Sequence, residues 1–406
     1  MGMSKLNQEV SPSPKTGPRI ILFTGKGGVG KTSTAAATAV LAAQRGVGTL
    51  ILSTDAAHSL SDSFDLPVGP TPTLVSDRLW ALEIDVNRQL SKNWGPIHGF
   101  LHKFLRSRGF DSIIADELAI LPGLEEIFSL LEVKDHAADP RFGLIIIDCA
   151  PTADTARLLA LPDIARWYME KIFHLERAVV RTVRPVAERF LDVPLPTDDV
   201  FAAVEKLYHH IMAVKKLLTD RDKASIRMVV NAEKMVIKEA LRAYTFLSIF
   251  DFGIDAVIIN RLLPAEIKDP YYGKWHEIQA EHLKFIHDSF EPLPLLTARL
   301  WDREIVGLEL LADLGREIYR DRDPAEVLHR ERAIRITPQD GRYILGLPVP
   351  FAGRDELETW VHGDELVIKY KNFRRNIVLP RALSNLKLLG AEFKGQSLNL
   401  IFGGEK

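Results

Sequence analysis

Short apolar runs alternate with long helical stretches over most of the chain, from Arg19 to about residue 320. Several of these runs are apolar at every position rather than at every second position. Strands buried on both faces show this pattern, which is typical of a parallel sheet covered by helices on both sides. Strands are predicted at residues 19–24, 49–54, 80–84, 144–147, 225–230 and 256–259, and helices at residues 34–44, 233–250 and 302–319.

This repeated strand–helix–strand order predicts an α/β fold with a parallel sheet and right-handed crossovers. Residues 90–134 and 164–220 interrupt the order, and both segments are mostly helical in pattern. They are too long for plain connections, so we expect a helical subdomain at one edge of the core. Their aromatic and aliphatic side chains either line a groove for a client or pack the helices against one another.

The pattern changes again near the C-terminus. Strands are predicted at residues 342–347, 365–370, 373–379, 385–389 and 397–402, with Gly, Pro, Asn and Asp between them. Short strands at this spacing favour a small all-β sandwich. The predicted organisation is therefore a flexible leader at 1–18, a core domain with its helical subdomain at 19–331, and a β-sandwich domain at 332–406.

Composition and charge narrow the class of protein. The 406 residues carry 52 basic and 54 acidic side chains, a formal charge of −2, which argues against nucleic acid as a partner. No apolar run is long enough to span a bilayer, so we expect membrane contact only through clients. The single cysteine, Cys149, excludes an intrachain disulfide and a cysteine-rich zinc site. This usage predicts a cytoplasmic protein, and the chloroplast stroma stays open as the compartment if the source is a plant.

A glycine-rich motif directly follows the first predicted strand and precedes the first predicted helix. Its sequence, GKGGVGKT, matches the phosphate-binding pattern GxxxxGK[ST]. Glycines let successive backbone N–H groups face phosphate oxygens, and the helix N-terminus adds the positive end of its dipole. The motif predicts a P-loop NTPase whose nucleotide is held by Gly25, Lys26, Gly27, Gly28, Val29, Gly30, Lys31 and Thr32.

Together with two further segments, this motif resembles the ArsA-like ATPases. That family includes the arsenite-pump ATPase and the ATPase that targets tail-anchored membrane proteins. Residues 53–62 (STDAAHSLSD) resemble the family's switch I, and residues 148–155 (DCAPTADT) resemble its switch II. Residues 231–264 resemble the region that supplies an asparagine to the adenine base. The resemblance covers residues 19 to about 322 and implies an ATP-hydrolysing enzyme.

The resemblance implies three catalytic residues. Asp55 would position the attacking water, and Lys31 would offset charge on the phosphates. Lys26 is the second lysine of the deviant P-loop, and in this family it reaches the nucleotide of a neighbouring subunit. A charge delivered in trans acts as an arginine finger does, which implies a homodimer with the nucleotides between its subunits. The alternative for Lys26 is an exposed, solvated side chain.

ATP and Mg²⁺ are the cofactors that the resemblance implies. Thr32 and, through water, Asp148 would hold the metal ion, Ser33 would bond the α-phosphate, and Asn260 would contact the adenine edge. For Asp55 and Asp148 the alternative is a plain helix cap. Which residues near 299–301 contact the base stays open.

The C-terminal strands resemble the α-crystallin domain of small heat-shock proteins, in residues 365–370, 373–380 and 395–400. An unrelated β-sandwich is the alternative.

ArsA-like ATPases fused to such a module form a subgroup, which favours a chaperone or a targeting factor for hydrophobic, tail-anchored clients. The runner-up is a nucleotide-switched scaffold like the chromosome- and septum-positioning ATPases. An arsenite-efflux subunit is disfavoured, because a metalloid site needs several thiolates and this chain has one cysteine.

Overall fold

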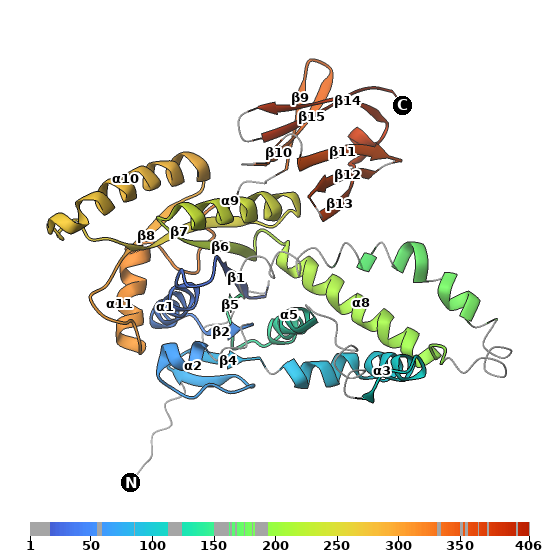
Figure 1. Ribbon diagram of the computed structural model, residues 1–406, viewed down its shortest axis with the longest axis horizontal. Coiled ribbons are helices and arrows are strands. Elements are labelled where there is room, and N and C mark those ends of the chain that lie inside the picture. Colours follow the sequence, from blue (N-terminus) through green and yellow to red (C-terminus); the bar gives the residue numbers. More distant parts are fainter. Residues whose placement is uncertain are drawn as a thin grey trace, which may run out of the picture.

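The computed structural model confirms an α/β core with an all-β region at the C-terminus (Figure 1). It describes residues 17–54, 59–84, 86–112, 124–149, 162, 165–166, 169–173, 175–180, 182, 194–330, 334–349, 352–353, 356–363, 365–371, 373–394 and 397–405. Its core is an eight-stranded sheet in the order β3-β4-β2-β5-β1-β6-β7-β8. All neighbouring strands in it are parallel except β3, which is antiparallel to β4. The strands are β1 (Arg19–Thr24), β2 (Thr49–Ser53), β3 (Thr73–Ser76), β4 (Leu79–Glu83), β5 (Leu144–Asp148), β6 (Ala224–Asn231), β7 (Ile254–Leu262) and β8 (Leu295–Arg299).

Continuous apolar runs place the central strands in the core. Every residue of β2, β5 and β6 is buried, as the absence of alternation predicts. Helix α1 (Lys31–Gln44) covers one face with an alanine-rich surface and packs against α11 (Leu308–Tyr319). The approach is close at Gly315, where an added Cβ would lie 2.7 Å from the Ala37 carbonyl oxygen. The remaining core helices are α2 (Ser59–Phe64), α9 (Lys234–Ile249) and α10 (Pro270–Phe290).

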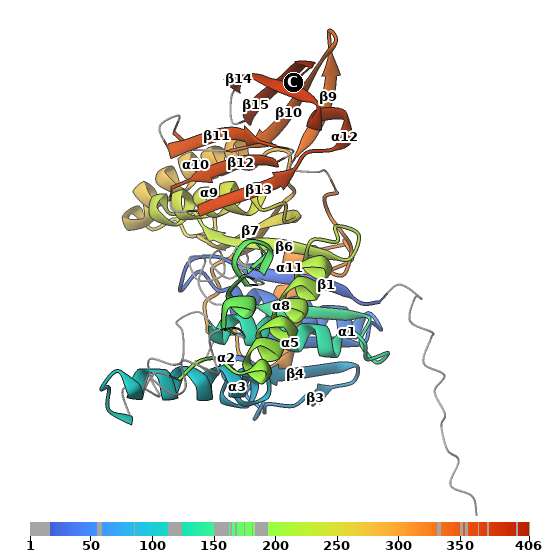
Figure 2. The same ribbon diagram turned by 90° about the vertical axis from the view of Figure 1, so that its right-hand side faces the viewer.

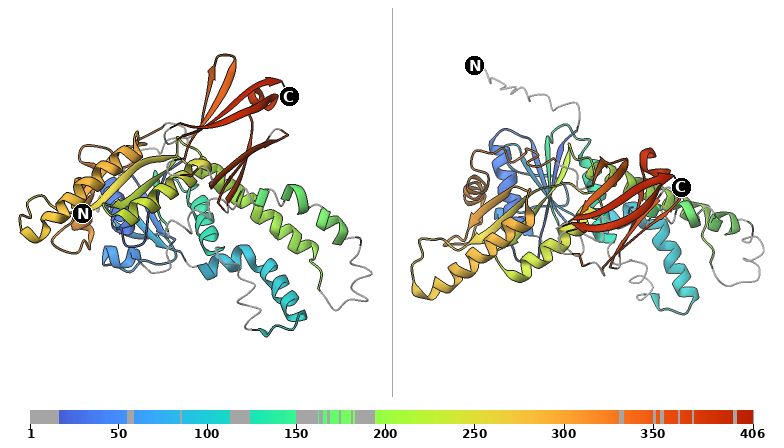
Figure 3. Two further views of the ribbon diagram at one scale, coloured as in Figure 1. Left: turned by 45° about the horizontal axis from the view of Figure 1, so that its top comes forward. Right: turned by 90° about the horizontal axis from the view of Figure 1, so that it is seen from above.

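Three long helices form a projection that we call the helical arm: α3 (Val86–Ser107), α5 (Leu124–His136) and α8 (Asp198–Leu218). They pack against one another, and α8 also contacts β6. The arm and α10 lie at opposite ends of the molecule (Figures 1 and 3). The helices expected within residues 90–134 and 164–220 are thus present in the described part of those segments, where a one-turn π-helix spans Met169–Phe173. No helix among the described residues is both long enough and apolar enough to cross a membrane.

The C-terminal strands form two antiparallel sheets, β14-β15-β10-β9 and β11-β12-β13. Leu345, Leu347, Leu366, Leu400 and Phe402 are buried within this sandwich. Helix α9 lies between it and the central sheet (Figure 2), and contacts β10. The elements are β9 (Arg335–Gln339), β10 (Arg342–Pro348), β11 (Leu357–His362), β12 (Glu365–Tyr370), β13 (Phe373–Val378), α12 (Arg381–Ser384), β14 (Leu386–Lys394) and β15 (Ser397–Glu405).

A buried ion-pair network fastens the segment between the two regions to the core. The Arg227 guanidinium, fully buried, donates to the carbonyl oxygens of Pro324 (2.7 Å) and Glu326 (2.8 Å) and to the Tyr319 hydroxyl (3.0 Å). Asp255, also fully buried, pairs with Arg227 and accepts a hydrogen bond from the Leu328 backbone. Residues 324–328 are therefore attached to the sheet by side chains rather than by chain continuity alone.

Candidate functional site

Backbone conformation shapes the loop between β1 and α1 into a cradle. Gly28 and Gly30 have φ values of 82° and 90°, in the left-handed region that L side chains rarely adopt. At Gly30 a Cβ would also collide with the Asn260 amide, and at Gly25 it would collide with the Val229 carbonyl. Only glycine fits these positions, so the curvature that faces the loop amides inward depends on them.

The lysine and threonine that end the motif sit beside the end of β5. Lys31 is 8% exposed, and its Nζ lies 3.4 Å from the Lys26 carbonyl oxygen. The Thr32 hydroxyl donates to Asp148 Oδ2 at 2.6 Å, and Asp148 is 1% exposed. The structure thus brings together Lys31 and Thr32 of the glycine-rich motif and Asp148, which the sequence analysis took from a different segment.

These side chains fit a magnesium site. Hydroxyl and carboxylate oxygens are the ligands that Mg²⁺ takes from proteins, usually one or two of them with water and phosphate oxygens. Thr32 and Asp148 present such oxygens next to a phosphate cradle. They are the described residues that would hold the ion.

Asn260 and Arg261, at the end of β7, support the loop from the other side. The Asn260 amide donates to the Val29 carbonyl oxygen at 2.9 Å, and the Arg261 guanidinium donates to the Gly28 carbonyl oxygen at 2.9 Å. Asn260 therefore positions the P-loop through its amide nitrogen. The sequence analysis assigned this residue to the adenine base and did not predict its contact with the loop. Arg261 was missed altogether.

A pocket of about 280 Å³ opens next to this loop. Ser33 and Asn260 line it, as does the segment that follows β8. There the Arg299 guanidinium lies 5.6 Å from the centre of the Trp301 ring, and Glu317 accepts hydrogen bonds from the Arg299 backbone (2.6 Å) and the Trp301 indole (3.0 Å). Glu317 fixes the two side chains that shape this wall, and it was not identified from sequence.

The remaining residues of the predicted site and the single cysteine have different outcomes. Lys26 is partly exposed, next to the exposed Gly27 and Gly28 at the rim of the loop. Asp55 and residues 150–155 of the predicted switch II lie outside the described residues. Cys149 is buried, and burial, followed by the charge of Asp148, raises the pKa of its thiol.

A P-loop after the first strand of a parallel sheet, with a carboxylate at the end of the adjacent strand, defines a P-loop NTPase. Within that class the chain belongs to the ArsA ATPases. The family model described as "Anion-transporting ATPase" matches residues 18–320, and one described as "HSP20-like domain found in ArsA" matches residues 340–402. The chain is thus an ATPase with an HSP20-like C-terminal domain, and it hydrolyses ATP.

Curated relatives match the chain over different shares of its length. The chain is 38% identical, over 96% of both sequences, to a "Putative arsenical pump-driving ATPase" of Chlorobaculum tepidum. It is 38% identical to "Putative arsenical pump-driving ATPase 1" of Aquifex aeolicus, over 91% of this chain and 96% of the relative. "ATPase ASNA1 homolog 2" of Paramecium tetraurelia is 28% identical over 71% of this chain and 90% of its own length.

Proposed function

We propose that this ATPase is a Mg²⁺-dependent homodimer that handles apolar protein clients, as a chaperone or as a targeting factor for tail-anchored membrane proteins. The observation that carries the proposal is accessible apolar surface beside the helical arm. Phe110, Leu175 and Val179 are 44%, 67% and 52% exposed. Leu175 and Val179 are four residues apart in one helical stretch, so they share a face. Apolar side chains grouped in this way mark interaction sites more often than scattered ones do.

The catalytic part of the proposal assigns a role to each residue at the loop. Lys31 binds the phosphates, the loop amides hold them, and Thr32 and Asp148 hold Mg²⁺. When bound, the ion offsets charge on the β- and γ-phosphates. Asp55 positions the attacking water. Lys26 acts on a nucleotide held by a second subunit, and its partly exposed position at the rim of the loop supports this role.

Mixing two inactive variants tests the trans role of Lys26. If Lys26 acts across the interface, a Lys26→Ala subunit paired with an Asp55→Asn subunit contains one intact site. A mixture of equal amounts should then recover about a quarter of wild-type ATPase activity, because half of the dimers have one of two sites. If the mixture recovers no ATPase activity, or if Lys26→Ala alone is fully active, then Lys26 does not act across the interface.

The client role is tested by changing the apolar surface without touching the nucleotide site. Phe110→Ser, Leu175→Ser and Val179→Ser together should abolish capture of a model tail-anchored protein by the ATP-trapped Asp55→Asn enzyme. A matched control replaces two equally exposed leucines elsewhere, Leu74 and Leu389 (62% and 53% exposed), and should capture the client normally. Equal capture by both sets would contradict a client site on these residues.

The names of the bacterial relatives favour a second candidate, an ATPase that drives arsenical export. Arsenite binds soft thiolate ligands. The chain has one cysteine, Cys149, which is 3% exposed and whose pKa is raised by burial. We therefore rank arsenical export below client handling, and stimulation of ATPase activity by arsenite would reverse that order.

A further inference from the structure

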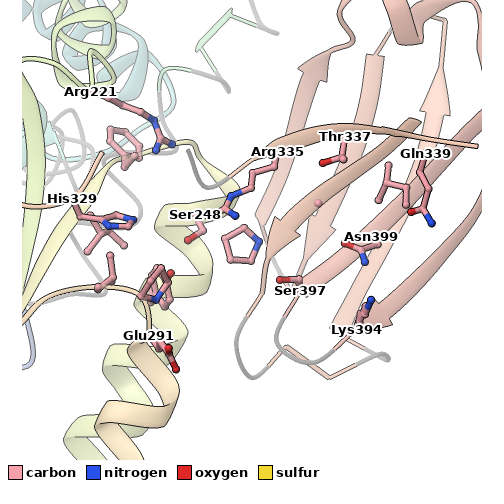
Figure 4. Close-up of a pocket in the computed structure, with 18 residues that line it drawn as sticks. Arg221, Ser248, Glu291, His329, Arg335, Thr337, Gln339, Lys394, Ser397 and Asn399 are labelled. Carbon is pink, nitrogen blue, oxygen red and sulfur yellow. The ribbon is translucent and has the colours of Figure 1, made fainter. Parts of the chain in front are cut away.

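A cavity of about 740 Å³ lies between the C-terminal sandwich and the core (Figure 4), and it shares no described residue with the pocket beside the P-loop. Arg221, in the cavity, pairs with the Asp251 carboxylate at 2.6 Å. Arg261, in the pocket beside the P-loop, instead donates to a backbone carbonyl of the loop, that of Gly28. An arginine placed in this way acts on the loop itself.

The charge of Arg261 has no carboxylate partner among the described residues. Two other arginines in the described lining of the same pocket are compensated. Arg299 lies 3.5 Å from the Glu317 carboxylate, and Arg303 lies 2.9 Å from the Asp302 carboxylate. Arg261 is exposed, and its side chain bonds the loop. Its charge is therefore directed at the loop carbonyl rather than neutralised by an acid.

A β-bulge at the end of β7 sets the direction of this side chain. Ile259 pairs with Thr297 of β8, and the next pair joins Leu262 to Arg299, so three steps on β7 face two on β8. Arg261 lies within the bulge and has a φ of 57°, in the left-handed region that glycine favours. Bulges re-aim side chains and are common next to active sites. The backbone of β7 thus departs from regular geometry at the residue that contacts the loop.

The bulge turns two consecutive side chains onto the same loop. In a regular strand Asn260 and Arg261 would point to opposite faces of the sheet. Here Asn260 donates to the Val29 carbonyl oxygen, and Arg261 donates to the Gly28 carbonyl oxygen, each at 2.9 Å. Two neighbouring peptide units of the P-loop are therefore held from the end of one strand.

Holding a carbonyl also aims the N–H group of the same peptide unit. A trans peptide is planar, with its C=O and N–H on opposite sides. The Gly28 carbonyl shares its peptide with the Val29 N–H, and the Val29 carbonyl shares its peptide with the Gly30 N–H. Neither N–H donates to an acceptor within the described part of the chain, although Val29 is only 1% exposed. Buried N–H groups are normally paired, and in a P-loop the partner of such groups is a phosphate oxygen.

We propose that Arg261 is a positioning residue of the nucleotide site, which acts through the peptide that joins Gly28 to Val29. Its hydrogen bond aims the Val29 N–H into the cradle. Its positive charge on the carbonyl oxygen polarises the peptide, so that this N–H becomes a stronger donor to the diphosphate of the nucleotide. Asn260 aims the Gly30 N–H in the same way but without charge. The role rests on nucleotide binding at the P-loop, and not on dimerisation or on the handling of clients.

Calorimetric titration of ADP into the full chain, with EDTA in place of Mg²⁺, measures this contribution. Arg261→Gly removes the side chain and suits the left-handed backbone. It should bind ADP about tenfold more weakly or worse, since a charge-assisted hydrogen bond to the loop is lost. Arg261→Lys keeps a charged donor and should stay within about threefold of the wild-type affinity. Wild-type affinity of Arg261→Gly, or equal weakening by both variants, would overturn the proposal.

Arg303→Gln is the matched control for charge. It removes an arginine from the same pocket, one that pairs with Asp302. Because that pair is exposed, the variant should change the affinity for ADP by less than about twofold. A loss as large as that of Arg261→Gly would mean that any positive charge in the pocket has the same effect, which contradicts a role through the loop peptide.

Amide signals separate this role from general support of the loop. In protein labelled with ¹⁵N-valine and ¹⁵N-glycine, saturation with ADP should move the Val29 and Gly30 amide protons of the wild type downfield, as both gain phosphate oxygens. In Arg261→Gly the downfield shift of Val29 should shrink, while that of Gly30, which Asn260 still holds, should remain. An unchanged shift of Val29, or equal loss at both amides, would overturn the proposal. These measurements involve neither Mg²⁺ nor a client, and they do not depend on Lys26 or Asp55, so they and the tests of the proposed function fail independently.

Discussion

Asp148 and Thr32 show how a single hydrogen bond prepares the nucleotide site. The 2.6 Å contact joins the first turn of α1 to the end of β5, so both oxygens are held in place by secondary structure. Rigid placement of such groups is what phosphoryl transfer requires, because catalysis there rests on positioning and charge.

The first prediction concerns Asp148. Asp148→Asn should lower ATPase activity about 100-fold or more and shift its dependence on Mg²⁺ to higher concentrations, because a neutral amide binds the hydrated ion poorly. Steady-state ATPase assays across a magnesium titration measure this. Asp288→Asn, an exposed carboxylate on α10, is the control and should retain full activity. An Asp148→Asn enzyme with normal activity would exclude a role for this carboxylate.

Cys149 gives a second prediction at the same scale. Burial, followed by the charge of Asp148, raises the pKa of its thiol, so at pH 8 almost none of the folded protein carries the reactive thiolate. Iodoacetamide should therefore modify the native protein far more slowly than the protein unfolded in urea, as followed by mass spectrometry. Rapid native modification would mean that this residue is accessible in solution.

Among the elements, the packing of α11 on α1 gives a third prediction. At Gly315 an added Cβ would lie 2.7 Å from the Ala37 carbonyl oxygen and 3.0 Å from Leu41 Cβ. Gly315→Ala should therefore lower the free energy of unfolding by about 1–3 kcal/mol, as overpacking does.

A second helical glycine provides the control. Gly273 is exposed on α10, and an added Cβ would meet nothing within 4 Å. Gly273→Ala should raise the free energy of unfolding by about 0.5–1 kcal/mol, because alanine restricts the unfolded chain. Urea titrations of both variants measure the difference, and equal stability of the two would contradict the close approach of α11 and α1.

The elements that sequence pattern did not predict share a physical cause. All six core strands predicted from apolar runs are present, because a fully buried strand must be apolar throughout. The edge strands β3, β8 and β9 were not predicted, and neither was β11: none of the four is buried throughout, and β9 contains Pro338. Helix α10 buries only Ile286, Ser289 and Phe290, so it has no clear apolar stripe. Helix α11 begins at Leu308 rather than near residue 302, after Gly307 with φ of 84°.

The residues that meet around the P-loop could be found from sequence where they lie in a local motif. Gly25–Thr32 and Asp148 could be found because a loop and a strand end carry recognisable sequence. Arg261, Trp301 and Glu317 could not, since their contacts join β7, the segment after β8, and α11. Nothing in local pattern indicates which arginine at a strand end reaches a loop carbonyl more than 200 residues away.

For the whole molecule, the last prediction is that ATPase activity depends on the core domain and not on the C-terminal domain. Deleting residues 332–406 should leave ATPase activity within about twofold of the full chain, since each described residue of the phosphate site precedes residue 320. It should weaken suppression of client aggregation, measured by light scattering, if the HSP20-like domain is itself a chaperone module. Equal scattering with both chains would give the domain a structural role.

Arg227 has a hydrodynamic consequence. It bonds two carbonyl groups of the connecting segment, and its partner Asp255 holds a third point, the Leu328 amide. These bonds hold residues 324–328 on the ATPase core. The amides of residues 324–328 should therefore relax with the correlation time of the core rather than with the faster motion of a loose linker, as NMR relaxation would measure.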